Sequence, residues 1–61
     1  MQVLFKDVKS GKLIGAAHNF YSPRGNRMDV LVQKKLENEG YEQICSDYEY
    51  GNKVVMMRRR E

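Results

Sequence analysis

Residues 26–40, NRMDVLVQKKLENEG, decide the fold of this chain. Their apolar residues recur at spacings of three and four, which is typical of one face of an amphipathic helix: Met28, Leu31, Val32 and Leu36. Gly40 is a natural end for the helix, because glycine readily adopts the left-handed conformation that follows many helices. The stretch therefore predicts a helix that packs its apolar face on another layer of the protein.

The start of this helix has two candidates. Asn26 can serve as the N-cap, with Asp29 at the third helical position. Ser22 followed by Pro23 offers a start four residues earlier, because proline is well tolerated at the first helical position. The sequence leaves both starts open.

The residues before the helix predict a β-hairpin. QVLFKDV, residues 2–8, is rich in β-branched and aromatic residues, and Ser10-Gly11 offers a tight turn because glycine supplies a positive φ. LIGAAH, residues 13–18, predicts the returning strand, although it is also compatible with a short helix. Gly15 within this strand indicates a bulge or a close approach of another segment.

The residues after the helix, 41–61, predict a second hairpin that turns at Gly51-Asn52. A two-residue turn there pairs, on the face expected to meet the helix, Tyr50 with Lys53, Tyr48 with Val55, Ser46 with Met57 and Ile44 with Arg59. A three-residue loop would shift the register by one and turn Val54 and Met56 inward instead. The expected fold is α+β: a single ββαββ domain over residues 1–61, with one helix packed on a mainly antiparallel sheet.

Two segments carry a resemblance to known proteins: LVQKKLENEGYEQI, residues 31–44, and VVMMRR, residues 54–59. This part of the chain, residues 31–60, resembles a family of short bacterial and phage proteins of unknown function, which end a helix in E-G-W-E-L and continue into a hairpin closed by an apolar strand and basic residues. Tyr41 stands where the family has tryptophan, and Gln43-Ile44 replaces its Leu-Val. The resemblance implies the helix and hairpin of the second half and no activity.

The length of 61 residues is near the lower limit for a domain without disulfides or metals, so we expect a homo-oligomer, with a dimer as the simplest form. One cysteine and one histidine cannot form an internal disulfide or a Cys/His zinc site. We expect Cys45 to be a buried strand residue and His18 to lie at a strand end. A non-enzymatic protein without cofactor or metal is therefore predicted.

Charge is distributed unevenly along the chain. Residues 1–27 have five basic side chains and one acidic one, a net +4; residues 28–52 have a net −4, and residues 53–61 a net +3. Such segregation favours an anionic partner or head-to-tail self-association. No apolar run is long enough for a signal peptide or a membrane span, so we expect a cytoplasmic protein with no membrane partner.

Nucleic-acid binding is the first functional hypothesis. Single-strand binders combine aromatic planes for base stacking with guanidinium groups for phosphates. The residues of that kind are Phe20, Tyr21, Arg24, Arg27, Arg58, Arg59 and Arg60. The competing interpretation is that the two aromatics plug the sheet edge while the arginines at the end of the last strand keep the protein soluble.

The alternative hypothesis is a protein-interaction module, such as a small inhibitor or accessory subunit, or an uncharacterised structural protein. Its candidate contacts are an acidic helix end and a tyrosine-rich hairpin: Glu37, Glu39, Glu42, Tyr48 and Tyr50. The carboxylates oppose the helix dipole, so they do not serve the helix itself.

Overall fold

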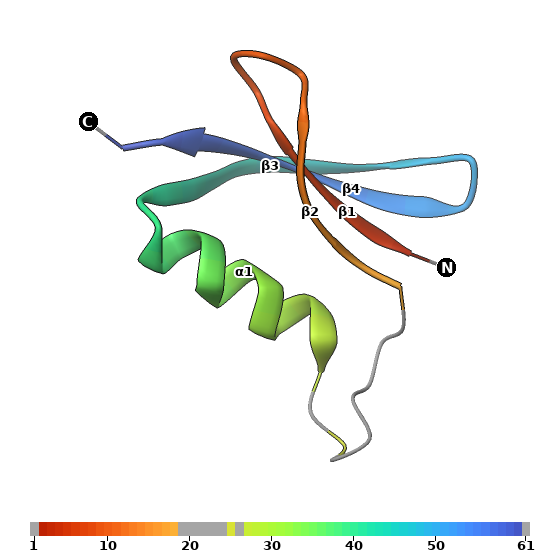
Figure 1. Cartoon of the computed structure of the whole chain (residues 1–61). Coiled ribbons are helices and arrows are strands. Elements are labelled where there is room, and N and C mark those ends of the chain that lie inside the picture. The colour runs from red at the N-terminus through yellow and green to blue at the C-terminus, as the bar shows by residue number, and fades with distance from the viewer. Residues whose placement is uncertain (1, 19–24, 26, 61) are drawn as a thin grey trace.

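The computed structural model describes residues 2–18, 25 and 27–60. These residues form two strands, β1 (Val3–Asp7) and β2 (Leu13–Ala17), then the helix α1 (Met28–Asn38), then two strands, β3 (Tyr41–Glu49) and β4 (Asn52–Arg59). The strands make one sheet in the order β2-β1-β4-β3, and α1 lies across one of its faces (Figure 1). The predicted ββαββ order is confirmed.

The sheet is mixed. Both hairpins are antiparallel, whereas β1 and β4 pair in parallel at the centre of the sheet. A parallel pair requires a long crossover, and here the chain makes it by passing from the outer edge at β2 through α1 to the opposite edge at β3. The helix therefore covers one face while it links the two hairpins.

The first hairpin turns where the sequence predicts. Gly11 has a φ of 73°, and its backbone N–H donates to the carbonyl oxygen of Asp7 at 2.7 Å. The Asp7 carboxylate accepts hydrogen bonds from the Lys9 backbone N–H at 3.0 Å and from the Ser10 hydroxyl at 3.3 Å. The turn is thus held by its own side chains.

Gly15 brings the helix close to the second strand. The alternative of a short helix at residues 13–18 is wrong, because Leu13–Ala17 pairs with β1. The register shifts opposite Phe5 and Lys6, and a Cβ atom at Gly15 would lie 3.1 Å from Cγ1 of Val32 and 3.3 Å from Cδ1 of Leu36. Both the bulge and the close approach predicted for Gly15 are present.

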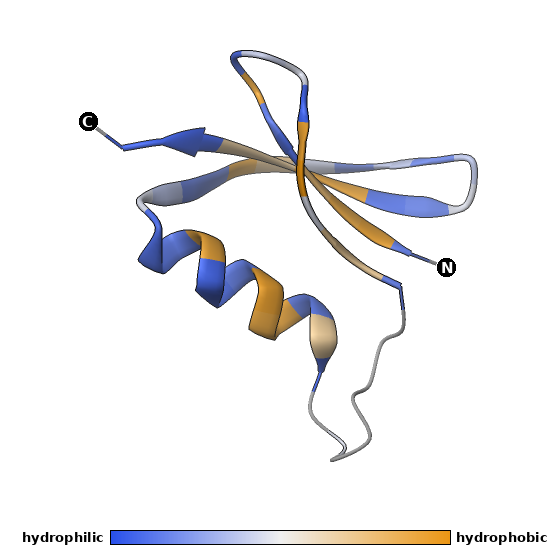
Figure 2. Ribbon diagram, in the orientation of Figure 1, coloured by the Kyte–Doolittle hydropathy of each residue, from blue (hydrophilic) through white to orange (hydrophobic). Residues whose placement is uncertain are grey.

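The core lies between the sheet and α1. Its buried residues come from the central strands, from β2 and from the helix: Val3, Phe5, Ala17, Leu36, Val55 and Met57. Phe5 and Met57 are the largest fully buried side chains. The apolar positions on α1, β1 and β4 can be followed in Figure 2. Leu31, expected on the same helical face as Leu36, is instead 44% exposed, because the face in contact with the sheet runs through Met28, Val32 and Leu36.

The two ends of α1 differ in how well they were predicted. The N-cap is Arg27, without a side-chain cap hydrogen bond, so the predicted cap at Asn26 is wrong by one residue. Asn26 itself and the rival start at Ser22-Pro23 lie outside the described residues. At the other end Gly40 has a φ of 100°, which confirms the predicted stop.

The second hairpin turns one residue earlier than predicted. Tyr50 and Gly51 form the turn with φ values of 52° and 79°, so Glu49 pairs with Asn52 and Tyr48 with Lys53. The predicted register, with Tyr50 opposite Lys53, is wrong by two residues. Asn52 lies in β4 instead of in the turn, and its side-chain oxygen accepts a hydrogen bond from the backbone N–H of Gln2 at 3.0 Å.

The predicted inward face of this hairpin is nevertheless confirmed for β4. A slip of two residues keeps every side chain on its face, since side chains alternate with a period of two. Val55 and Met57 accordingly lie in the core. Ile44 falls in the register shift between Gln43 and Cys45, and is 42% exposed instead of packed under the helix.

Candidate functional site

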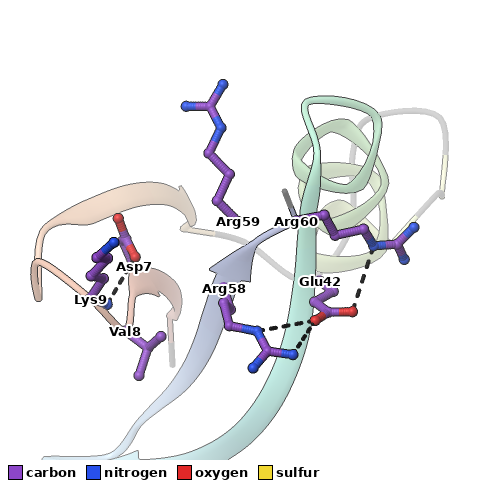
Figure 3. A pocket seen from close by; sticks show the side chains of 7 residues that line it. All are labelled: Asp7, Val8, Lys9, Glu42, Arg58, Arg59 and Arg60. Carbon is purple, nitrogen blue, oxygen red and sulfur yellow. Dashed lines mark hydrogen bonds and ion pairs between the residues drawn. The ribbon is translucent and has the colours of Figure 1, made fainter.

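The three consecutive arginines lie at the end of β4, next to the turn of the first hairpin. The parallel pairing brings these segments together, and the Val8 backbone N–H continues it by donating to the Met57 carbonyl oxygen at 2.9 Å. An open cleft forms here, lined by the β1–β2 turn and by the adjacent ends of β3 and β4: Asp7, Val8, Lys9, Glu42, Arg58, Arg59 and Arg60 (Figure 3). We call this the arginine cleft.

Glu42 holds two of the arginines in place. Its Oε1 accepts hydrogen bonds from Nη2 of Arg58 at 2.6 Å and from Nε at 3.2 Å, while Oε2 lies 3.6 Å from Nε of Arg60. The hydrogen bond from Arg58 lowers the pKa of the Glu42 carboxyl below its ordinary value, with a further contribution from the charge of Arg60. Glu42 is therefore ionised at neutral pH and fixes both guanidinium groups beside it (Figure 3).

Arg59 points away from this pair. Alternation along β4 sends it to the face that carries the helix, where its guanidinium lies 5.8 Å from the centre of the Tyr41 ring. Figure 3 shows Arg59 extending away from Glu42, whereas Arg58 and Arg60 are both joined to it. The three arginines thus approach the cleft from both faces of the strand.

The electrostatic balance of the arginine cleft is basic. Its lining contains four cationic side chains, those of Lys9 and the three arginines, against the carboxylates of Asp7 and Glu42, a net charge of +2. Asp7 is engaged within its own turn, and Glu42 with Arg58 and Arg60. Such a site can attract anions and can donate guanidinium hydrogen bonds to phosphate or carboxylate oxygens.

Arg27 does not belong to the arginine cleft. Arg27 lies at the start of α1. The cleft lies near the other end of the helix, because β4 ends beside the start of β3, the strand that follows α1. The 11 residues of α1 between these two ends span about 16 Å. The Arg27 guanidinium binds the Asp29 carboxylate through Nε and Nη2, at 3.0 and 2.7 Å. Phe20, Tyr21 and Arg24 lie outside the described residues.

The residues expected to bind a protein are dispersed. Glu37 and Glu39 lie at the exposed end of α1, and Glu42 is bound by arginines on the sheet. Tyr48 is six residues farther along β3, about 20 Å from Glu42. Tyr48 is 64% exposed and Tyr50 fully exposed at the hairpin tip. The acidic and the tyrosine parts of that prediction are therefore separate surfaces.

Cys45 and His18 are not brought together. They lie at opposite edges of the sheet, β3 and the end of β2, which are about 14 Å apart across the four strands. His18 is exposed at a strand end, as predicted, but Cys45 is exposed and not buried. Its side chain points away from α1, because it shares a face with Met56 and not with Met57.

Among residues 2–18, 25 and 27–60, no three carboxylate, histidine or cysteine side chains are grouped so that they could hold a metal ion. In the same part of the chain, no helix has the length and apolar character to cross a membrane.

Lys9 and Asp7 are lining residues that the sequence did not point to. They belong to the first hairpin, 49 or more residues before Arg58, and only the parallel pairing of β1 with β4 places them beside the arginines. No local pattern in the sequence predicts the pairing of β1 with β4.

Comparisons of the chain with family models, with curated proteins and with solved structures found no significant match.

Proposed function

We propose that this protein binds nucleic acid through the arginine cleft. The observation that carries the proposal is the placement of Arg58, Arg59 and Arg60 beside Lys9 at one end of the sheet. Phosphates are recognised by clustered guanidinium groups, which fork onto two oxygens at once. Arg58 and Arg60 are already oriented by Glu42, so part of the side-chain ordering that binding requires has been achieved before the ligand arrives.

Tyr41 offers the cleft an aromatic neighbour. It is half-buried against the core, and Arg59 lies over its ring. A base could stack on the Tyr41 ring, either in place of Arg59 or beside it, and such stacking does not depend on the identity of the base. Phe20, Tyr21 and Arg24, which lie outside the described residues, are further candidates for stacking and phosphate contact.

The test is titration of a fluorescent single-stranded oligonucleotide at several salt concentrations, followed by anisotropy. We expect affinity to fall steeply with salt, and Arg59→Gln or Lys9→Gln to weaken binding and to reduce the salt dependence by about one counterion each. Lys34→Gln is the matched control, because it removes the same charge from the exposed helix surface. Lack of binding at about 50 mM salt, or an equal loss in the Lys34 control, would refute the proposal.

A protein partner is the second candidate, favoured by the exposed tyrosines at the β3–β4 hairpin tip. Tyr50 is fully exposed and holds a positive φ of 52°, although asparagine or glycine fits that conformation better. Exposed tyrosines supply contact area at low entropic cost. Capture of a protein that survives nuclease treatment and high salt, and is lost in Tyr48→Ser/Tyr50→Ser, would favour this function over the first.

A further inference from the structure

The face of the sheet opposite α1 is the second surface of interest. Strand register and alternation place two apolar rows on it. The six apolar residues are Ala16, Leu4 and Val54 in one row and Leu13, Met56 and Cys45 in the other, where Lys6 lies between Leu13 and Met56. None of the six belongs to the core cluster under the helix. We call this surface the open face.

The open face is apolar at its centre. Val54 is only 6% exposed, although no described element covers this side of the sheet, and Leu4 and Met56 are half-buried. Leu13, at the edge, is 57% exposed. The molecule measures 15 Å along its shortest axis, so it is thin for a domain that would bury both faces of its sheet. An apolar surface with charged residues among and around its apolar ones is typical of an association site.

Charge on the open face is divided between its two halves. The β3 half carries three carboxylates, those of Glu42, Asp47 and Glu49, of which Glu42 is paired with Arg58. The β1–β2 half carries Lys6 and the exposed His18, and its described residues place no carboxylate on this face, because Asp7 points to the other side. One half is therefore acidic, and the other carries the positive charge of Lys6.

We propose that the open face binds the open face of a second copy of this chain. Two copies related by a two-fold axis parallel to the strands would place the acidic β3 half of each over the β1–β2 half of the other, which carries Lys6, with the apolar rows in contact between them. An axis perpendicular to the strands would instead stack β3 on β3 and oppose the carboxylates of the two copies. Charge thus selects one arrangement of the pair.

The inference does not rest on nucleic-acid binding, although the open face meets the arginine cleft at Glu42 and Arg58. The test is the mass of the nuclease-treated protein, measured by sedimentation equilibrium over a range of concentrations. We expect a monomer–dimer equilibrium for the unaltered chain. Leu13→Glu, which puts a carboxylate opposite the acidic β3 half, should raise the dissociation constant by tenfold or more, about the effect of losing 1.4 kcal/mol of binding free energy.

Matched variants make the result specific. Leu31→Glu is the control, because Leu31 is similarly exposed, at 44%, but lies on α1; it should leave the equilibrium unchanged. Lys6→Glu and Asp47→Lys should each weaken the dimer, and the double variant should recover part of the loss because it restores one pair of opposite charges between the two halves. A monomer at all concentrations, or a dimer equally indifferent to Leu13→Glu and Leu31→Glu, would overturn the proposal.

Discussion

The two faces of the same four strands differ in what covers them. Beneath α1 the side chains of Phe5 and Met57 are fully buried and touch helix residues, whereas on the open face Leu4 and Met56 are only half-buried. Neighbouring residues along one strand therefore differ in how deeply they are buried. The covered face stabilises the fold, and the open face is the one that we propose for association. Hydrophobic character alone does not separate the two roles, because both faces carry large apolar residues.

Met56 and Met57 give the largest expected contrast, because they are the same residue type on opposite faces. Met57→Ala should lower the free energy of unfolding by about 2–5 kcal/mol, since it leaves a cavity at a fully buried site. Met56→Ala should cost about 1 kcal/mol or less. Urea unfolding of the two variants, measured at a concentration where the protein is monomeric, gives the comparison. Equal losses would mean that both faces are covered in the monomer.

Gly15 and Ala16 form a second pair across the two faces. Gly15→Val should destabilise by about 1–3 kcal/mol, because even a Cβ atom there meets Val32 and Leu36 at 3.1 and 3.3 Å. Ala16→Val, on the open face, should change the free energy of unfolding by no more than about 0.5 kcal/mol. The thermal or urea midpoints of both variants test this. If Gly15→Val were tolerated, the close contact of α1 with β2 would be refuted.

The smallest expected effect concerns the two ion pairs. The hydrogen bond from Arg27 lowers the pKa of Asp29 below its ordinary value of 3.8, and the Asp29 side chain is 12% exposed. Because the folded-state pKa is the lower one, this stabilisation is complete above pH 3.8 and is lost as the pH falls through the folded-state pKa. Asp29→Asn should cost about 1 kcal/mol at neutral pH and little in acid.

Glu42→Gln is the comparison for the arginine cleft. Glu42 is more exposed than Asp29, at 33%, so its removal should affect unfolding less than Asp29→Asn does. Unfolding free energies from pH 2 to 7 for both variants separate the two pairs. A larger loss for Glu42→Gln at pH 7 would contradict the ranking.

Local sequence patterns predicted the helix and the strands. The position of the second turn and the bulge near Ile44 could not be predicted from such patterns. Alternation in VVMM was enough to place Val55 and Met57 inward, and Gly40 and Gly11 marked their turns correctly. The turn at Tyr50-Gly51 was missed because Gly51-Asn52 suits the same geometry, and the bulge near Ile44 has no sequence signal. Turns of this kind are decided by tertiary contacts such as that of Asn52 with Gln2.

Only part of the arginine cleft was predicted from the sequence. The run of arginines at residues 58–60 is visible in the sequence, but its meeting with Lys9 depends on the parallel pairing of β1 and β4, which joins the two ends of the chain. Cys45 was expected to be buried because strand cysteines often are; its position on an edge strand and on the open face is likewise a result of strand order.

The reactivity of the Cys45 thiol tests the contrast between the two faces most directly. Cys45 is exposed on the open face beside Met56, so a thiol reagent should modify it in the native protein without unfolding. Because the second copy would cover this face, the rate constant should fall as the protein concentration rises through the dimerisation range. A rate that is independent of concentration, whether fast or negligible, would contradict an open face that closes only by self-association.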